Sequence, residues 1–126
     1  MSSYAVWLDH ENAKIFKFTP GVKGSVEAQV LHRKEIRHHT NRAENEKKVN
    51  EDKFYHDVAT HLSDATELLI LGPGTGRTHF QKHLESHHHG SLAKAVVGVE
   101  PMDHPTDKQI VASARKFFKK WDMYHE

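Results

Sequence analysis

The stretch LLILGPGTGRTHF, from Leu68 to Phe80, is an apolar run followed by three glycines, a proline, a basic residue and a threonine. Its apolar part does not alternate with polar residues, which is typical of a central β-strand covered on both faces. The glycines predict a tight turn. The residues that follow, RTHFQKHLESHHH, predict a helix with Phe80 and Leu84 facing inward. A buried strand that turns into a helix indicates an α/β fold.

The turn has the composition of a nucleotide-binding phosphate loop, whose pattern is G-x-x-x-x-G-K-[ST]. Only three residues separate Gly72 from Gly76, where the pattern needs four, and Arg77 stands in the place of the lysine. We therefore expect a strand-to-helix turn capped by Thr75 or Thr78 rather than a nucleoside-triphosphate site. The free N–H groups of the helix start still predict an anion-binding turn. Its residues are Gly72, Gly74, Thr75, Gly76, Arg77 and Thr78.

The rest of the chain supplies the other elements of this fold. Strands are predicted by alternating or apolar runs bounded by turn residues. They cover Tyr4–His10, Glu11–Thr19, Ser25–Arg33, Glu67–Gly72 and Ala93–Pro101. The element order β-β-β-α-β-α-β-α predicts a ribonuclease-H-like α/β fold. We expect a mixed five-stranded sheet in the order 3-2-1-4-5, with strands 1, 4 and 5 parallel and three helices on both faces.

Helical periodicity marks the first and last helices. The first carries Glu51 and Asp52 in its first turn and has one inward face, formed by Phe54, Val58, His61, Leu62 and Ala65. Thr106 and Gln109 predict a capping box at the start of the last helix. The apolar stripe of that helix consists of Ile110, Val111, Ala114, Phe117, Phe118 and Trp121.

Bulk properties narrow the class of protein. The chain of 126 residues fits one domain covering 1–126, and it has no cysteine for a disulfide or a cysteine zinc site. The formal charge of +1 does not by itself indicate nucleic-acid binding. No apolar run is long enough for a membrane span, and the N-terminus lacks the basic region of a signal peptide. We expect a cytoplasmic protein that needs no cofactor and does not contact a membrane.

A charged segment, Arg33–Lys48, separates the third strand from the first helix. It contains six Lys/Arg, three Glu and two His, and Ile36 is its only large apolar residue. We expect residues 34–48 to form an exposed loop of mixed charge. Its basic residues can follow an RNA backbone, or they can be a solvated surface with no partner. The candidate RNA- or ribosome-binding residues are Arg33, Lys34, Arg37, His38, His39, Arg42, Lys47 and Lys48.

Parallel strands place their carboxyl ends at one edge of the sheet, where ligands of open α/β sheets bind. This edge would gather Asp9, His10, Asp103 and His104 near the glycine turn. An Asp/His cluster can hold a divalent metal for hydrolysis. Alternatively, Asp9 is a hairpin residue and Asp103 belongs to the start of a helix.

Three histidines, His79, His83 and His87, are spaced four residues apart and share one helix face. Two such histidines can chelate a transition metal. No cysteine or carboxylate at ligand spacing completes a closed site. We therefore expect adventitious metal binding at most and assign no physiological metal.

Three motifs occur in this order along the chain: AVWLDHENAKIF, LLILGPGTGRTHFQKHL and DHPTDKQIVASARKFF. Together they resemble small bacterial single-domain proteins called translational machinery proteins, from Ala5 to Phe118. The middle motif also resembles the middle domain of archaeal and eukaryotic class-1 peptide-chain release factors and of Pelota-type ribosome-rescue factors. The resemblance implies the ribonuclease-H-like fold and a role in translation.

The chain departs from the release factors at their catalytic tripeptide, Gly-Gly-Gln, which places a water at the peptidyl-tRNA ester. In the release factors this tripeptide lies between the third strand and the first helix, where this chain has Arg33–Lys48. None of the three glutamines, Gln29, Gln81 and Gln109, follows a glycine.

We therefore expect a translation-associated protein that binds the ribosome or RNA without hydrolysing peptidyl-tRNA. Two alternatives are a metal-dependent hydrolase that uses Asp9 and Asp103, and a non-catalytic homo-oligomeric assembly factor. The sequence does not fix the oligomeric state.

Overall fold

A mixed β-sheet forms the centre of the computed structural model, which describes residues 2–18, 30–37, 44–87 and 91–124. Its strands are β1 (Ser3–Leu8), β2 (Asn12–Phe18), β3 (Val30–Arg37), β4 (Glu67–Gly72) and β5 (Val96–Pro101). They lie in the order β3-β2-β1-β4-β5. The β1–β4 and β4–β5 pairs are parallel, and β2 is antiparallel to β1 and to β3. The expected mixed α/β class is confirmed, and β2-β1-β4-β5 follow one another as expected.

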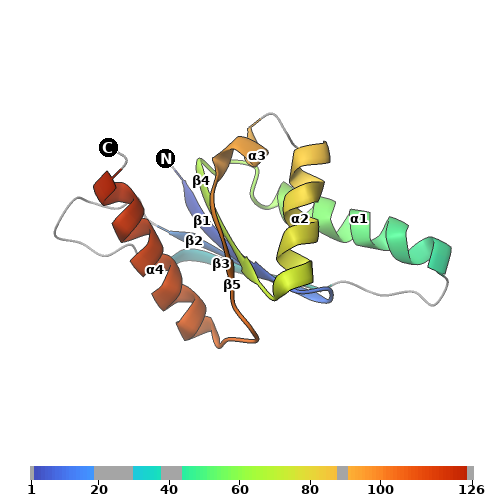
Figure 1. Cartoon of the computed structure of the whole chain (residues 1–126), viewed down its shortest axis with the longest axis horizontal. Helices are drawn as coiled ribbons and strands as arrows, with labels where there is room; N and C mark the ends of the chain where they lie inside the picture. The colour runs from blue at the N-terminus through green and yellow to red at the C-terminus, as the bar shows by residue number, and fades with distance from the viewer. Residues whose placement is uncertain (1, 19–29, 38–43, 88–90, 125–126) are drawn as a thin grey trace.

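The helices cover both faces of this sheet. They are α1 (Glu44–Thr60), α2 (Gly74–His87), α3 (Leu92–Ala95) and α4 (Asp107–Tyr124). Figure 1 shows α4 on one face and α1 and α2 on the other. The two faces have separate hydrophobic cores, one containing residues of α1, α2 and α3 and the other containing residues of α4. Within the described ranges, none of the helices has the length and hydropathy of a membrane span.

The central strands β1 and β4 are apolar on both sides because each side faces a core. In β1, Val6 and Leu8 enter the core of α1 and α2, whereas Trp7 enters the core of α4. In β4, Ile70 and Leu71 divide between the two cores in the same way. The unbroken apolar run of the sequence is therefore a consequence of two-sided burial, as predicted.

The structure has four helices among its described residues, where three were expected. The additional helix, α3, occupies Leu92–Ala95 and thus includes the beginning of the predicted strand Ala93–Pro101. Leu92 and Ala95 are three residues apart and both are buried, which is a helical rather than a strand spacing. The strand begins at Val96, where the β-branched residues begin.

The expected loop at residues 34–48 is wrong at its two ends, and its middle, residues 38–43, lies outside the described residues. The strand β3 continues to Arg37, and α1 already begins at Glu44. An edge strand is held by backbone hydrogen bonds and tolerates charged side chains. The polar residues after Arg33 therefore did not reveal that β3 extends to Arg37. In this extension, from residue 34 to 37, Ile36 is the only apolar residue, and it is buried opposite Ala13 of β2.

The start of α1 was also predicted too late. Its first residues, ENEKK, include two Glu and two Lys, which are good helix formers and need no burial to be helical. The predicted inward face holds for Phe54 and Val58, but His61 is exposed. His61 follows the end of the helix, and its Nδ1 lies 3.0 Å from the carbonyl oxygen of Asp57.

The capping box of α4 is confirmed. The N–H of Thr106 donates to Oε1 of Gln109 at 2.9 Å, and the N–H of Gln109 donates to Oγ1 of Thr106 at 3.2 Å. Of the predicted stripe, Ile110, Ala114 and Phe118 are buried against the sheet. This packing fixes the side of α4 that faces solvent.

Candidate functional site

The glycine turn after β4 is held together by its own backbone and by Arg77. The carbonyl oxygen of Gly72 accepts a hydrogen bond from the N–H of Met102 at 3.0 Å and another from Nη1 of Arg77 at 2.9 Å. Gly72 has a φ of +152°, and a β-carbon there would overlap the carbonyl oxygen of Leu8. Arg77 therefore folds back onto the turn, and the carbonyl oxygen of Gly72 links the turn to Met102, which follows β5.

The two glycines inside α2 have different surroundings. A β-carbon at Gly76 would lie 3.0 Å from Cα of Asp9 and 3.1 Å from the carbonyl oxygen of Leu8. A β-carbon at Gly74 would meet no atom within 4 Å. Gly76 thus allows the first turn of α2 to lie directly against the end of β1, which is a packing role.

The predicted caps of α2 are wrong, because the helix begins at Gly74 and includes both threonines. Oγ1 of Thr78 donates to the carbonyl oxygen of Gly74 at 2.8 Å, within the helix. Oγ1 of Thr75 lies 2.8 Å from Nε2 of His10. Anion binding at this turn stays a prediction.

Asp9 is a hairpin residue at the carboxyl edge of the sheet. Its Oδ1 accepts hydrogen bonds from the N–H of Glu11 at 2.8 Å and of Asn12 at 2.7 Å. Its own N–H donates to the carbonyl oxygen of Asn12 at 3.0 Å. Two backbone donors on one oxygen explain Asp9 as a turn residue between β1 and β2.

The other residues of the carboxyl edge lie around Asp9. Nδ1 of His104 is 3.8 Å from Oδ2 of Asp9, and the His104 ring is 5.6 Å from the Trp7 ring. Trp7 Nε1 donates to the carbonyl oxygen of Met102 at 3.0 Å. Asp103 is exposed. Across the ranges that the structure describes, no group of three His, Asp or Glu side chains can hold a metal. The alternative of a metal-dependent hydrolase thus has no converging carboxylates in this region.

The three histidines of α2 have unequal surroundings. His83 is buried, whereas His79 and His87 are exposed. Nδ1 of His79 lies 3.4 Å from Oε1 of Glu51, and Nδ1 of His83 lies 3.8 Å from Oδ1 of Asp52. The His83 and His87 rings are stacked with centroids 4.5 Å apart. His79 and His83 therefore join α2 to α1, whereas His87 contacts His83 within α2, and the expected surface ladder is wrong for His83.

The predicted basic loop residues lie outside the part of the chain whose side chains the structure describes. The backbones of Arg33, Lys34 and Arg37 belong to β3, and those of Lys47 and Lys48 belong to α1. His38, His39 and Arg42 lie outside the described residues. Their role in binding RNA stays a prediction.

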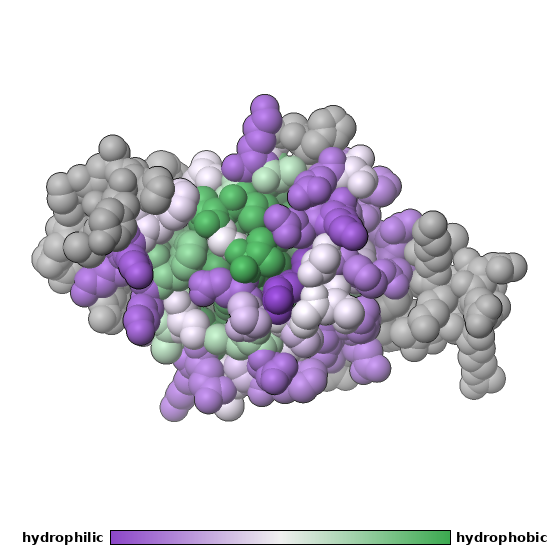
Figure 2. All heavy atoms as spheres, in the orientation of Figure 1, coloured by the Kyte–Doolittle hydropathy of each residue, from purple (hydrophilic) through white to green (hydrophobic). Residues whose placement is uncertain are grey.

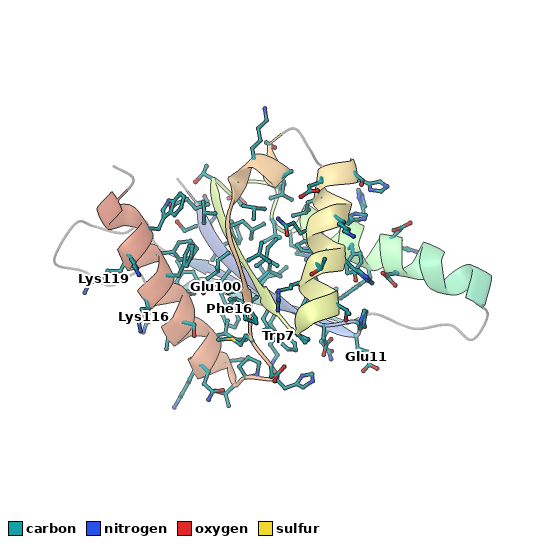
Figure 3. The ribbon with its side chains drawn as sticks, in the orientation of Figure 1. Trp7, Glu11, Phe16, Glu100, Lys116 and Lys119 are labelled. Atoms are coloured by element: carbon teal, nitrogen blue, oxygen red, sulfur yellow. The ribbon has the colours of Figure 1, made fainter. Side chains whose placement is uncertain are left out.

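The sequence analysis missed a basic surface on α4. We call it the α4 basic face; it consists of Lys108, Arg115, Lys116, Lys119 and Lys120. The four lysines are exposed, and Arg115 is half-buried. Figure 3 shows Lys116 and Lys119 on the side of α4 that points away from the sheet. These cations are spread along a helix in the sequence and do not form a dense charged segment like Arg33–Lys48.

An apolar surface lies next to α4 at the open edge of the sheet. β5 is the edge strand at the end of the sheet opposite β3. Its residues Val96, Val97 and Val99 are half-exposed. Figure 2 shows an apolar patch at the centre of this face, between α4 and α2. A β-carbon at Gly98 would lie 2.6 Å from the Phe117 ring, so the strand and α4 are in close contact.

A polar cluster at the opposite, amino-terminal edge of the sheet is centred on Asp64. Tyr4 Oη donates to Oδ1 of Asp64 at 2.6 Å, and Lys17 Nζ donates to Oδ2 at 3.0 Å. These two hydrogen bonds lower the pKa of Asp64 to about 2, and the one from Tyr4 has the larger effect. Burial and the Asp64 carboxylate raise the pKa of Tyr4.

We expect Asp64→Asn to lower the free energy of unfolding near pH 7 by about 0.5–1 kcal/mol, a modest loss because the Asp64 side chain is 53% exposed. The folded-state pKa lies below the usual value, so the contribution is present above pH ~4–5 and is lost as the pH falls toward about 2. Urea unfolding at several pH values measures this difference. Asp103→Asn, at an exposed position, is the control. A wild-type advantage that stays constant down to pH ~2 would contradict the linkage.

Comparison with known proteins shows the fold. No protein-family model and no curated protein sequence matches the chain. Among solved structures, Archaeoglobus fulgidus Pelota matches 98% of the chain at 15% identity with a TM-score of 0.63. The archaeal translation termination factor aRF1 matches 98% at 17% identity with a TM-score of 0.62. The chain covers 35% of that Pelota chain and 38% of the aRF1 chain.

A third structure, Thermus thermophilus RuvC, matches 95% of the chain at 11% identity with a TM-score of 0.53, and 80% of the RuvC chain is covered. This match is consistent with the expected ribonuclease-H-like fold. The three matches together establish that the chain has the fold of a domain found in Pelota and aRF1.

Proposed function

We propose that the chain is a translation-associated domain that binds the ribosome or RNA and does not hydrolyse peptidyl-tRNA. The observation that carries the proposal is the match of nearly the whole chain to Pelota and to aRF1, of which aRF1 is a translation termination factor. The three quoted motifs, which resemble translational machinery proteins, support the same conclusion. We further propose that residues 1–126 act as one domain.

The proposal of a non-hydrolytic role rests on the glutamines of the chain. Gln81 lies within α2. The side chain of Gln109 is used in the capping box of α4. Gln29 follows an alanine and lies outside the described residues. None of the three stands in a Gly-Gly-Gln tripeptide.

Ribosome binding is tested by sedimentation of a lysate through a sucrose gradient. At low salt we expect the chain to sediment with ribosomes, and we expect the fraction bound to fall as salt rises because phosphate contacts release counterions. The double variant Arg37→Ala/Arg42→Ala tests whether the segment between β3 and α1 contributes. If the chain stays entirely at the top of the gradient at low salt, the proposed function is wrong.

Hydrolysis is tested with ribosomes that carry labelled peptidyl-tRNA. We expect the chain to release no more peptide than buffer does, because no Gly-Gly-Gln is present to place a water. A release factor that carries the tripeptide is the positive control. Release above the buffer background would show that the chain uses another catalytic group.

A further inference from the structure

We propose that the α4 basic face binds the phosphate backbone of RNA. The inference rests on the proposed function only in the choice of RNA as the polyanion. The surface is separate from the segment Arg33–Lys48 along the sequence, and it lies on α4, which covers one face of the sheet (Figure 1). The charge, exposure and position of its residues support the proposal.

The four lysines of this face form no ion pair within the part of the chain that the structure describes. Lys108, Lys116, Lys119 and Lys120 are exposed, and none forms an ion pair with a carboxylate of the described residues. Lysines elsewhere do: Lys14 pairs with Asp107 at 3.1 Å, and Lys17 pairs with Asp64 at 3.0 Å. The four lysines of α4 are therefore available to an external anion.

The arrangement of these cations does not favour helix stability. Lys116 and Lys120 are four residues apart, as are Arg115 and Lys119, and like charges at this spacing repel each other. The last turn of α4 has no basic residue, so the helix dipole does not explain the cluster either. A bound polyanion would remove this repulsion.

α4 has an excess of positive charge equal to that of the segment Arg33–Lys48. The helix has five Lys/Arg and two Asp, whereas the whole chain has 18 basic and 17 acidic residues. The remainder of the chain therefore has 13 basic and 15 acidic residues and is net negative. A formal charge of +1 thus conceals two segments of net positive charge, α4 and Arg33–Lys48, in a chain whose remaining residues are net acidic. This asymmetry is typical of nucleic-acid-binding surfaces.

The geometry of α4 suits a rigid phosphate-binding surface. The helical rise places Lys108 and Lys119 about 16 Å apart along the axis. A nucleic-acid duplex carries on the order of ten phosphates over that length. The opposite side of the helix is buried through Ile110, Ala114 and Phe118. A helix that binds a membrane surface needs a free apolar face, and that of α4 is occupied by the sheet, so RNA is the favoured polyanion.

The test measures binding of a fluorescein-labelled RNA duplex by anisotropy at about 50 mM and about 200 mM salt. The triple variant Lys116→Gln/Lys119→Gln/Lys120→Gln removes three cations of the α4 basic face. We expect binding at low salt to weaken by about tenfold or more and the salt dependence to fall by about two to three phosphate contacts. A matched variant, Lys53→Gln/Lys82→Gln/Lys94→Gln, makes the same charge change at exposed lysines of α1, α2 and α3. We expect this control to bind within about twofold of wild type.

Three results would overturn the proposal, provided that both variants unfold at the temperature of the wild type. The first is an equal loss of affinity in both variants, which would mean that overall charge alone acts. The second is that the wild type fails to bind the RNA at low salt. The third is that the triple variant loses binding to vesicles of anionic lipid while it keeps its affinity for RNA.

Ribosome pelleting separates this inference from the proposed function. If the wild type pellets and the α4 triple variant pellets equally well, the α4 basic face is not the binding surface but the proposed function stands. If the wild type does not pellet, the proposed function itself fails. If only the α4 triple variant fails to pellet, both are supported.

Discussion

Replacing Gly72 with alanine is expected to lower the free energy of unfolding by about 3 kcal/mol or more. A φ of +152° is a conformation that residues with a β-carbon rarely adopt, and the strain costs about 1–3 kcal/mol. The new β-carbon would also overlap the carbonyl oxygen of Leu8, which belongs to the backbone of the central strand and cannot move alone. Such overpacking costs about 1–3 kcal/mol more.

Gly74→Ala is the matched control, two residues further along the same turn. A β-carbon there meets no atom within 4 Å, and the residue already lies in α2. We expect a change within about 0.5 kcal/mol or a small gain in stability, because alanine favours a helix. Chemical denaturation of both variants measures the difference. Equal losses in the two variants would show that the turn needs flexibility in general rather than a glycine at position 72.

Phe118→Ala is expected to lower the free energy of unfolding by about 3–5 kcal/mol. Phe118 is buried to 2% exposure in the core between the sheet and α4, and its ring lies 5.8 Å from that of Phe18 in β2. Removing the ring leaves a cavity between the helix and strand β2 of the sheet. The position of the α4 basic face depends on this contact.

Lys120→Ala, two residues further along α4, is the control for the phenylalanine. Lys120 is exposed, and its removal relieves one like-charge pair with Lys116, so we expect a change within about 0.5 kcal/mol. Denaturant titration followed by circular dichroism compares the two variants. A loss below about 1 kcal/mol for Phe118→Ala would mean that α4 is not held by this core.

Apolar patterns of the sequence predicted much of the fold. The unbroken run Leu68–Leu71 identified the central strand because burial on both faces leaves no room for polar side chains. The stripe of α4 and its capping box were equally visible, since they depend on short-range spacing. The extension of the edge strand β3 beyond Arg33 was not visible, because backbone pairing with β2 holds it whatever side chains it carries.

The candidate site was harder to predict because its hydrogen bonds depend on how the two turns are folded. The sequence placed Asp9 and His104 at one edge, but only the structure shows that Asp9 Oδ1 is occupied by two backbone N–H groups. The fold of Arg77 back to Gly72 likewise depends on three-dimensional geometry. The α4 basic face was overlooked for a different reason. Its cations are spread over a helix rather than contiguous, so they do not form a conspicuous charged segment.

The most direct test of the account is the pelleting of the purified chain with purified ribosomes at about 50 mM and about 200 mM salt. We expect the chain to pellet with ribosomes at the lower concentration and to be released at the higher one, because Lys/Arg contacts to phosphates are lost as salt rises. A chain that stays in the supernatant at both concentrations would contradict a ribosome-binding role for this release-factor-like fold.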